Sequence, residues 1–323
     1  MYKNKSKGFT ILIFVGFLQI STVISAQKSS WTPLFNGKDF NNFEQLNGKA
    51  EYRIEKGTMI GISKLKTPNS FLATKKKYSD FILEFEVMVD YGLNSGVQFR
   101  SNSTTDFKNG RVHGYQCEIE TSPRKWAGGV YDEARRGWLY PLTRNKKGQD
   151  AFVNGTWNHY RIEALGNEIR TYVNGVMCTN LVDPLTNEGF IAFQVHAIGK
   201  EEDEGKIVRW RNINILTEKI AEHRLPVADY APEISYLENE LSSSEIRKGW
   251  RLLWDGKSNK GWRAAKGNQF PTKGWVIENG ILSVEASDGG ESRNGGDIVT
   301  EDLFSNFELS VDFKLTKASC PFL

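Results

Sequence analysis

Apolar and polar residues alternate over short runs between about residues 31 and 217. In FILEFEVMV, residues 81–89, every second residue is apolar and two of the residues between are glutamate. Asn174 and Gly175 lie between two further runs and match a two-residue hairpin turn of the primed type. No helical period persists. This pattern predicts an all-β domain, a sandwich or jelly roll with one sheet face in the core.

The alternation stops at residues 218–249, where Pro226, Pro232 and many charged residues occur. This composition predicts a linker between two domains. Near its end, Ser242 followed three residues later by Glu245 matches a capping box and predicts a short helix.

Three motifs occur twice along the chain, in the same order. LFNGKDFNNFEQL at 34–46 returns at 253–265, YRIEKGTMIGIS at 52–63 returns at 275–286, and the run at 71–89 returns at 297–315. Such long-period similarity predicts two copies of one domain. We expect a complete copy at 31–217 and a truncated second copy at 250–323, which breaks off in KASCPFL and leaves strand edges unpaired. Candidate chemistry then belongs to the first copy.

The first 26 residues predict a secretory signal peptide. Three lysines precede an apolar run that ends near Ala26, and a transmembrane anchor is the alternative. Removing those lysines brings the formal net charge of +3 to neutral. We therefore expect a periplasmic or extracellular protein without a nucleic-acid partner and, once the signal is removed, without a membrane span. Its three cysteines do not form a disulfide scaffold, although a Cys117–Cys178 bridge is an alternative to two buried thiols.

Three predicted strands carry polar residues opposite their core-facing positions. The strands are SGVQFR at 95–100, YQCEIE at 115–120 and FIAFQVHAIG at 190–199. Their polar positions on that face are Gln98, Arg100, Gln116, Glu118, Glu120, Gln194 and His196. If the strands are neighbours in one sheet, these side chains form a single patch that can bind a small polar ligand. A solvated face with ordinary cross-strand ion pairs is the alternative.

The segment at 121–141, TSPRKWAGGVYDEARRGWLYP, interleaves aromatic and charged residues. Its aromatic residues include Trp126, Tyr131 and Trp138, and its charged residues include Asp132 and Arg135. Such a set suits a sugar, which has apolar ring faces and a rim of hydroxyls. A salt-bridged hairpin with packed aromatic residues explains the pattern equally well.

No G-x-S-x-G elbow, phosphate loop, H-E-x-x-H pair or dinucleotide fingerprint occurs. The chain instead resembles the 3-keto-disaccharide hydrolase domain family at GYQCEIE, GGVYDEARRGW, WNHYRIEALGNEIRTYVNG and IAFQVH, with LFNGKDF and WDGK resembling its N-terminal signature. The resemblance implies a concanavalin- or laminin-G-like jelly roll that acts on glycosides oxidised to a 3-ketone. It implies functional residues at Arg100, Gln116, Glu118, Glu120, Asp132, Gln194 and His196. Glu120, Thr121 and Ala127 depart from the usual family residues.

A ketone at carbon 3 acidifies the proton on carbon 2, so a base can start elimination of the group on carbon 1. We expect His196 or Glu118 as base, Glu120 or Asp132 as acid or metal ligand, and Arg100 as partner of the enolate oxygen. A divalent metal at Glu118, Glu120 and His196 is an alternative to Arg100. Substrate contacts are expected from Gln98, Gln116, Gln194, Trp126, Tyr131, Arg135 and Trp138.

Three other functions compete with this interpretation. The strongest is a non-catalytic carbohydrate-binding module, since jelly rolls bind glycans through aromatic residues. A conventional retaining or inverting glycosidase and an adhesion protein follow.

Overall fold

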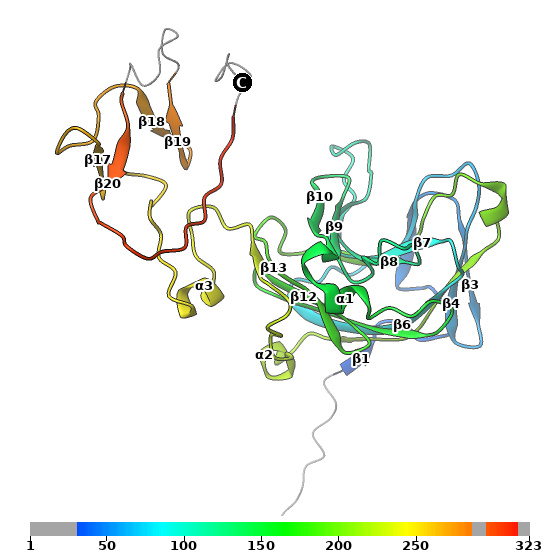
Figure 1. Ribbon diagram of the computed structural model, residues 1–323. Helices are drawn as coiled ribbons and strands as arrows, with labels where there is room; N and C mark the ends of the chain where they lie inside the picture. Colours follow the sequence, from blue (N-terminus) through cyan, green and yellow to red (C-terminus); the bar gives the residue numbers. More distant parts are fainter. Residues whose placement is uncertain (1–30, 286–294, 316–323) are drawn as a thin grey trace, which may run out of the picture.

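The computed structural model describes residues 31–285 and 295–315. The predicted signal peptide, Cys320 and the final KASCPFL lie outside these residues. Residues 31–216 fold into two antiparallel sheets that pack face to face (Figure 1). The predicted all-β jelly-roll fold is therefore confirmed for this part of the chain. In the described residues, no helix combines the length and apolar character needed to cross a bilayer.

The larger sheet has the strand order β16-β13-β12-β11-β6-β15-β4-β3, with β1 beside β15. Its strands, in this order, are Ile234–Ser235, Val176–Val182, Glu168–Val173, Asn158–Leu165, Phe81–Val89, Ile207–Leu216, Thr58–Ile62 and Glu51–Glu55, and β1 is Trp31–Pro33. Asn174 and Gly175 connect β12 to β13 with φ angles of 49° and 79°. Both angles are positive, as a primed hairpin turn requires, so that turn is confirmed.

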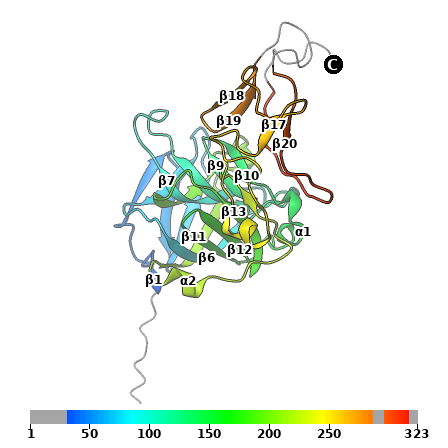
Figure 2. The ribbon, with the colours of Figure 1, turned by 90° about the vertical axis from the view of Figure 1, so that its left-hand side faces the viewer.

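The second sheet carries the predicted polar strands and has the order β10-β9-β8-β7-β14-β5-β2. Its strands, in this order, are Gly137–Tyr140, Val130–Glu133, His113–Glu120, Asn94–Asn102, Phe190–Val195, Ser70–Thr74 and Phe43–Asn47. The strands β8, β7 and β14, which hold the three polar segments, are direct neighbours. In Figure 1, β9 and β10 rise above β7 and β8, and Figure 2 shows the same domain turned by 90°.

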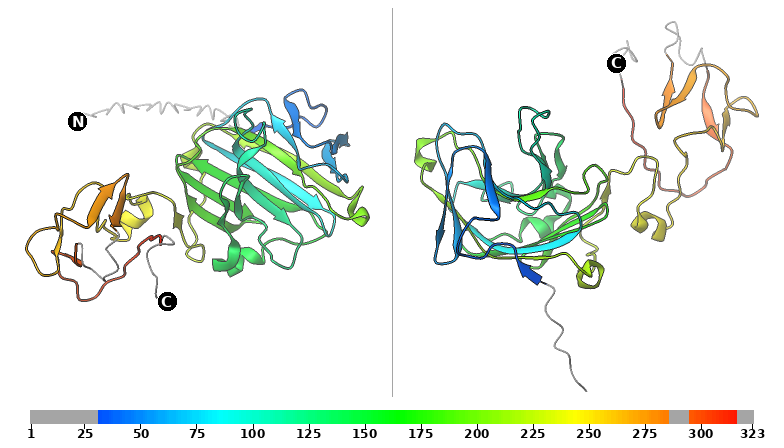
Figure 3. Two further views of the ribbon diagram at one scale, coloured as in Figure 1. Left: turned by 90° about the horizontal axis from the view of Figure 1, so that it is seen from above. Right: turned by 180° about the vertical axis from the view of Figure 1, so that it is seen from behind.

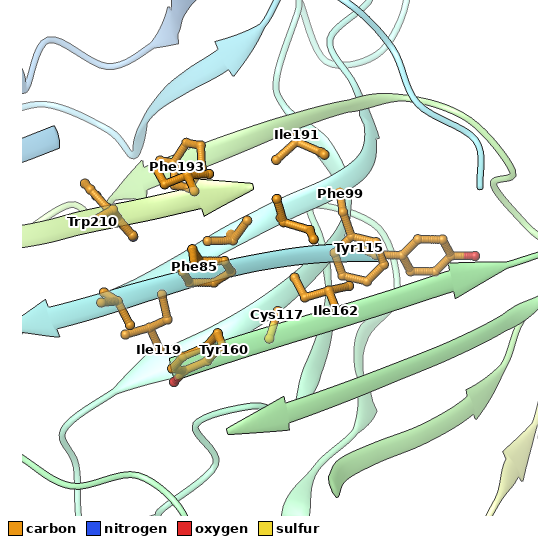
Figure 4. Close-up of a cluster of buried hydrophobic side chains, with 14 of the residues drawn as sticks. Phe85, Phe99, Tyr115, Cys117, Ile119, Tyr160, Ile162, Ile191, Phe193 and Trp210 are labelled. Carbon is orange, nitrogen blue, oxygen red and sulfur yellow. The ribbon is translucent and has the colours of Figure 1, made fainter. Parts of the chain in front are cut away.

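Alternate residues of both sheets meet in one core (Figure 4). All the apolar positions predicted to face inward on the three polar strands are buried there: Val97, Phe99, Tyr115, Cys117, Ile119, Ile191, Phe193 and Val195. Aromatic pairs join the layers, such as Phe193 and Trp210, with ring centroids 5.6 Å apart. Cys117 and Cys178 are buried free thiols, so the alternative of a bridge between them is wrong.

Short helices lie outside the sheets: η1 (Leu142–Arg144), α1 (Lys146–Gln149), η2 (Glu201–Asp203), α2 (Ile220–His223) and α3 (Ser243–Arg247). The predicted capping box of α3 is present, with Glu245 N 3.1 Å from Ser242 Oγ and Ser242 N 2.7 Å from Glu245 Oε2. The segment before α3 packs on the first sandwich. Its β16 pairs with β13, and Tyr236 donates a hydrogen bond to the carbonyl oxygen of Leu139 (3.1 Å).

Beyond this segment, the chain forms two small ladders (Figure 3). β17 (Trp262–Ala264) pairs with β20 (Ile298–Thr300), and β18 (Trp275–Glu278) pairs with β19 (Ile281–Val284). In the sequence repeat, residues 307–315 correspond to β6, in which Phe81, Phe85 and Val87 are fully buried. Here the same positions form no strand, and Phe307, Val311 and Phe313 are exposed. The assignment of 250–323 as a truncated copy stays a prediction.

Candidate functional site

The outer face of the second sheet brings together four of the predicted site residues. Strand register places Gln116 of β8 opposite Gln98 of β7, and Glu118 opposite Gly96, which in turn lies opposite Gln194 of β14. The four polar side chains are at most 3% exposed. Toward β5 the same face continues as a small apolar cluster, which contains Phe71, Ala73, Val112, Phe190 and Ala192.

Gln116 lies at the centre of this group. Its Oε1 accepts hydrogen bonds from Gln98 Nε2 (2.7 Å) and Gln194 Nε2 (2.9 Å), and its Nε2 donates to Glu118 Oε2 (2.9 Å). This arrangement requires glycine at 96, because a Cβ there would lie 2.5 Å from Gln116 Cδ. Gln194 Oε1 is buried and has no hydrogen-bond partner among the described residues. That unpaired acceptor suits a hydroxyl donor of a bound ligand.

Glu118 is the titratable group best placed for proton transfer. Besides Gln116, its carboxylate accepts from Asn94 Nδ2 (2.6 Å) and lies 3.4 Å from Arg124 Nη2. Burial raises the pKa of Glu118 to about 7 and outweighs the hydrogen bonds from Asn94 and Gln116, which lower it. The nearby Glu120 raises this pKa further, whereas Arg124 lowers it. A carboxyl that titrates near neutral pH can accept and return a proton efficiently.

Glu120 has a different environment, although it follows Glu118 on the same face. It accepts hydrogen bonds from the backbone N–H of Trp126 (2.6 Å), from Ser122 Oγ (2.9 Å) and from Arg124 Nη2 (2.7 Å). These contacts fold residues 121–126 back onto the end of β8. The carboxylate of Glu120 thus holds a loop, and the same loop places Arg124 beside Glu118.

Arg124 and Asn94 are the residues of this group that the sequence interpretation missed. Arg124 lies in the predicted aromatic segment, four residues after Glu120, and that spacing was the available signal. Its guanidinium carbon is 4.5 Å from the ring centroid of Trp126 and 4.8 Å from that of Trp138. Tyr131 packs edge-on against Trp138, with centroids 5.2 Å apart. The three aromatic rings predicted to bind a sugar thus form one wall beside Glu118, and each is partly exposed.

Arg100 does not share the face of Glu118, so that expectation is wrong. The register of β7 shifts between Phe99 and Asn102, and Arg100 has a φ of 46°. This bulge turns the side chain toward the turns of the other sheet. The buried guanidinium donates to the carbonyl oxygens of Ser79 and Gly166 (both 2.7 Å) and to Asp80 Oδ1 (2.9 Å).

Asp132 and Arg135 also lie apart from Glu118. Asp132 pairs in register with Tyr115, a core residue, and is fully buried on that side of the sheet. Its carboxylate accepts from Arg135 Nε and from Arg136 Nε, both at 2.7 Å. The segment at 121–141 was interpreted either as a sugar-binding set or as a salt-bridged hairpin, and it has features of both. Its charged residues form an internal ion-pair network, and its aromatic residues line the candidate site.

His196 follows β14 directly. Since Val195 pairs with Ser95, His196 lies beside Asn94, two strands from β8. From the spacing of strands and residues, its Cα lies about 12 Å from that of Glu118. Its Nδ1 is 2.6 Å from the carbonyl oxygen of Ala197, which places a hydrogen on Nδ1. By the alternation of β14, the histidine is on the same side of the sheet as Gln194, beside Asn94.

The proposed metal ligands do not converge. Among residues 31–285 and 295–315, no group of three or more His, Cys, Asp or Glu side chains is arranged to hold a metal ion. Arg124 already supplies positive charge to both Glu118 and Glu120. The donor set of Glu118, Glu120 and His196 therefore does not fit a metal.

A cavity of about 170 Å³ borders Glu120 but is not lined by Glu118. Tyr91, Pro123, Phe152 and Asn154 contribute to its walls. The cavity is therefore bordered by Glu120 and by the loop that Glu120 holds, and Glu118 is not part of its lining.

Comparison with known proteins gives a family match over most of the chain. A family model described as a 3-keto-alpha-glucoside-1,2-lyase-like domain matches residues 30–216 and again residues 249–320. A curated relative, the 3-keto-disaccharide hydrolase of Bacteroides thetaiotaomicron, is 38% identical over 71 residues, which is 21% of this chain. That match spans 24% of the relative, about a quarter of its length.

Solved structures of similar shape include two putative glycosyl hydrolases of Parabacteroides distasonis. The first is 16% identical with a TM-score of 0.42, over 58% of this chain and 93% of its own. The second is 23% identical with a TM-score of 0.39, over 57% of this chain and 98% of its own. A carbohydrate-binding module of Bacillus subtilis is 18% identical with a TM-score of 0.33, over 54% of this chain and 94% of its own.

Proposed function

Because the chain belongs to the 3-keto-alpha-glucoside-1,2-lyase-like domain family, we propose that its first jelly roll cleaves glycosides whose sugar is a ketone at carbon 3. The observation that carries this proposal is Glu118, a buried carboxyl with a pKa of about 7 on a polar sheet face. A plain binding surface has no need of such a group, whereas removal of a carbon-bound proton requires one.

The reaction begins at carbon 2. The Glu118 carboxylate takes the proton from carbon 2, and the electron pair of that C–H bond passes to the ketone oxygen to give an enolate. The enolate then collapses back to the ketone, and its electron pair forms a double bond between carbons 1 and 2. The bond from carbon 1 to the glycosidic oxygen breaks, and the departing oxygen accepts a proton to leave as an alcohol. The other product is a 3-keto sugar unsaturated between carbons 1 and 2. Addition of water across that double bond gives the 3-keto sugar and makes the overall reaction a hydrolysis.

The remaining residues bind and orient the sugar. Trp138 and Tyr131 offer apolar faces to the ring, and Gln194 Oε1 accepts from a hydroxyl. His196 is on the same face, beside Asn94, and its imidazolium form, with hydrogens on both ring nitrogens, is the candidate donor to the departing oxygen. With the predicted signal peptide at 1–26, the substrate is met in the periplasm or outside the cell.

The test is release of the alcohol from a 3-keto-glucoside by the full chain. We expect release by the native protein and by Glu55→Gln, a matched change at an exposed position of β3, but at least a hundredfold less by Glu118→Gln. Undiminished turnover by Glu118→Gln would refute its assignment as base. Binding of the sugar by the native protein without any release favours a carbohydrate-binding module instead.

A further inference from the structure

Arg124 lies beside the proposed base, and some of its N–H donors form no hydrogen bond within the described residues. We propose that its guanidinium binds the oxygen on carbon 3 of the substrate and stabilises the negative charge that develops there. This inference rests on the proposed function and deepens it, because it assigns the group that recognises the ketone. The sequence had suggested Arg100 for this role, but the contacts of Arg100 lie toward the other sheet.

The hydrogen bonds of Arg124 occupy one side of its planar group. Nε is 3.2 Å from each carboxylate oxygen of Glu120, and Nη2 contacts Glu120 at 2.7 Å and Glu118 at 3.4 Å. In the part of the chain that the structure describes, Nη1 makes no hydrogen bond, and 39% of the side chain is exposed. Two N–H donors therefore remain for a ligand at the edge of the site.

The orientation of these donors is fixed before a ligand arrives. The Trp126 and Trp138 rings lie within 5 Å of the guanidinium carbon, and Glu120 accepts hydrogen bonds from Nε and Nη2 at the edge of the planar group. Glu120 is itself 96% shielded from solvent and fixed by the backbone N–H of Trp126. An arginine held by a carboxylate and two aromatic rings loses little side-chain freedom when it binds a ligand.

The separation between Arg124 and Glu118 matches the substrate. The reacting carbon 2 is bonded to carbon 3, so the proton acceptor and the donor to the ketone oxygen must approach neighbouring atoms. A base oxygen at about 3 Å from carbon 2 and a donor nitrogen at about 3 Å from the ketone oxygen give the usual geometry for proton abstraction beside a carbonyl. The 3.4 Å contact between Nη2 and Glu118 Oε1 keeps both groups at one end of the sugar.

The chemistry distinguishes a ketone from a hydroxyl at carbon 3. As the proton moves from carbon 2 to Glu118, the electron pair of the C–H bond delocalises onto the ketone oxygen, which becomes an enolate. A guanidinium that donates to this oxygen binds the transition state more tightly than the ground state. An unoxidised sugar develops no such charge, so Arg124 contributes to selectivity as well as to rate.

The experiment compares Arg124→Ala, Arg124→Lys and the control Arg53→Ala in the full chain. Arg53 is exposed on β3 of the larger sheet and pairs with Glu55, whereas Glu118 is on β8 of the second sheet. Turnover of a 3-keto-glucoside is measured on the pH plateau, since loss of Arg124 also raises the pKa of Glu118. We expect kcat to fall at least a hundredfold in Arg124→Ala and less in Arg124→Lys, with added guanidinium ion restoring part of the loss.

The inference is overturned if Arg124→Ala stays within threefold of Arg53→Ala. It is also overturned if the loss does not respond to guanidinium and is matched by a lower melting temperature, because that result indicates a role confined to the fold. These failures are distinct from failure of the proposed function, which would appear as no alcohol release by the native protein.

Discussion

Replacement of Glu118 by glutamine should change how stability depends on pH. The carboxyl has a pKa of 4.5 in a solvated chain and about 7 in the fold, so the folded state holds its proton more tightly. Ionisation of Glu118 therefore opposes folding. The penalty is absent below pH 4.5, develops as the pH rises through the window to about 7, and is then complete.

The size of the effect follows from the two pKa values. Each tenfold difference in proton affinity is worth about 1.4 kcal/mol, so ionised Glu118 costs the fold about 3 kcal/mol. Solvent screening hardly lowers this free energy, because Glu118 is only 3% exposed. Glutamine carries no charge at any pH, although its amide also changes the hydrogen bonds with Asn94 and Gln116. That second effect is independent of pH and cancels in a comparison across pH.

Urea unfolding of both proteins at several pH values between 4.5 and 8.5 measures this quantity. We expect the stability of Glu118→Gln relative to the native protein to rise by about 3 kcal/mol across the series, mostly between pH 4.5 and 7. Glu55→Gln, at an exposed ion pair, should show no such trend. If the native and Glu118→Gln curves run parallel in pH, burial does not raise the pKa of Glu118, and the reasoning fails.

Further predictions concern the surroundings of Glu118. The kcat/KM for a 3-keto-glucoside should rise with pH and level off above about 7, since the base must be ionised; a profile flat from pH 5 to 8 would contradict this. Gly96→Ala should lower stability by about 1–3 kcal/mol in thermal melts and reduce turnover, because its Cβ would displace Gln116; native values for both would disprove the need for glycine. Arg100→Ala should cost about 3–5 kcal/mol of stability, because it empties the space of a fully buried side chain and removes the donors to the carbonyl oxygens of Ser79 and Gly166; a stable but inactive variant would indicate that Arg100 takes part in catalysis.

Local sequence pattern was sufficient to predict the fold and the sharing of one face by Gln98, Gln116, Glu118 and Gln194. Strict alternation fixes which side of a strand a residue occupies, and three strands with the same alternation predict one surface once they are neighbours. The same logic failed at Arg100, because a bulge inserts an irregular residue and reverses the direction of the side chain. Nothing in SGVQFRSN marks that bulge.

The contacts of the loop at 121–126 could not be predicted from local sequence, because they depend on tertiary structure. Glu120 was expected as an acid or metal ligand, but its carboxylate is enclosed by a turn that brings back Arg124 and Trp126. Likewise, Asp132 and Tyr131 are adjacent in sequence and lie on opposite faces of β9, so only the aromatic residue reaches the site. Strand register and loop closure decide which of these side chains reach the candidate site. Both arise from contacts between distant parts of the chain.

The central claim is that Glu118 removes the proton on carbon 2 of a 3-keto sugar. NMR of a 3-keto-glucoside with the full chain in D₂O tests it directly, with the sugar's carbon 2 hydrogen followed during cleavage. We predict that this hydrogen is lost to solvent at least as fast as the alcohol is released, and that Glu118→Gln slows both processes together. Cleavage in which carbon 2 keeps its original hydrogen, or exchange that continues unchanged in Glu118→Gln, would contradict the account.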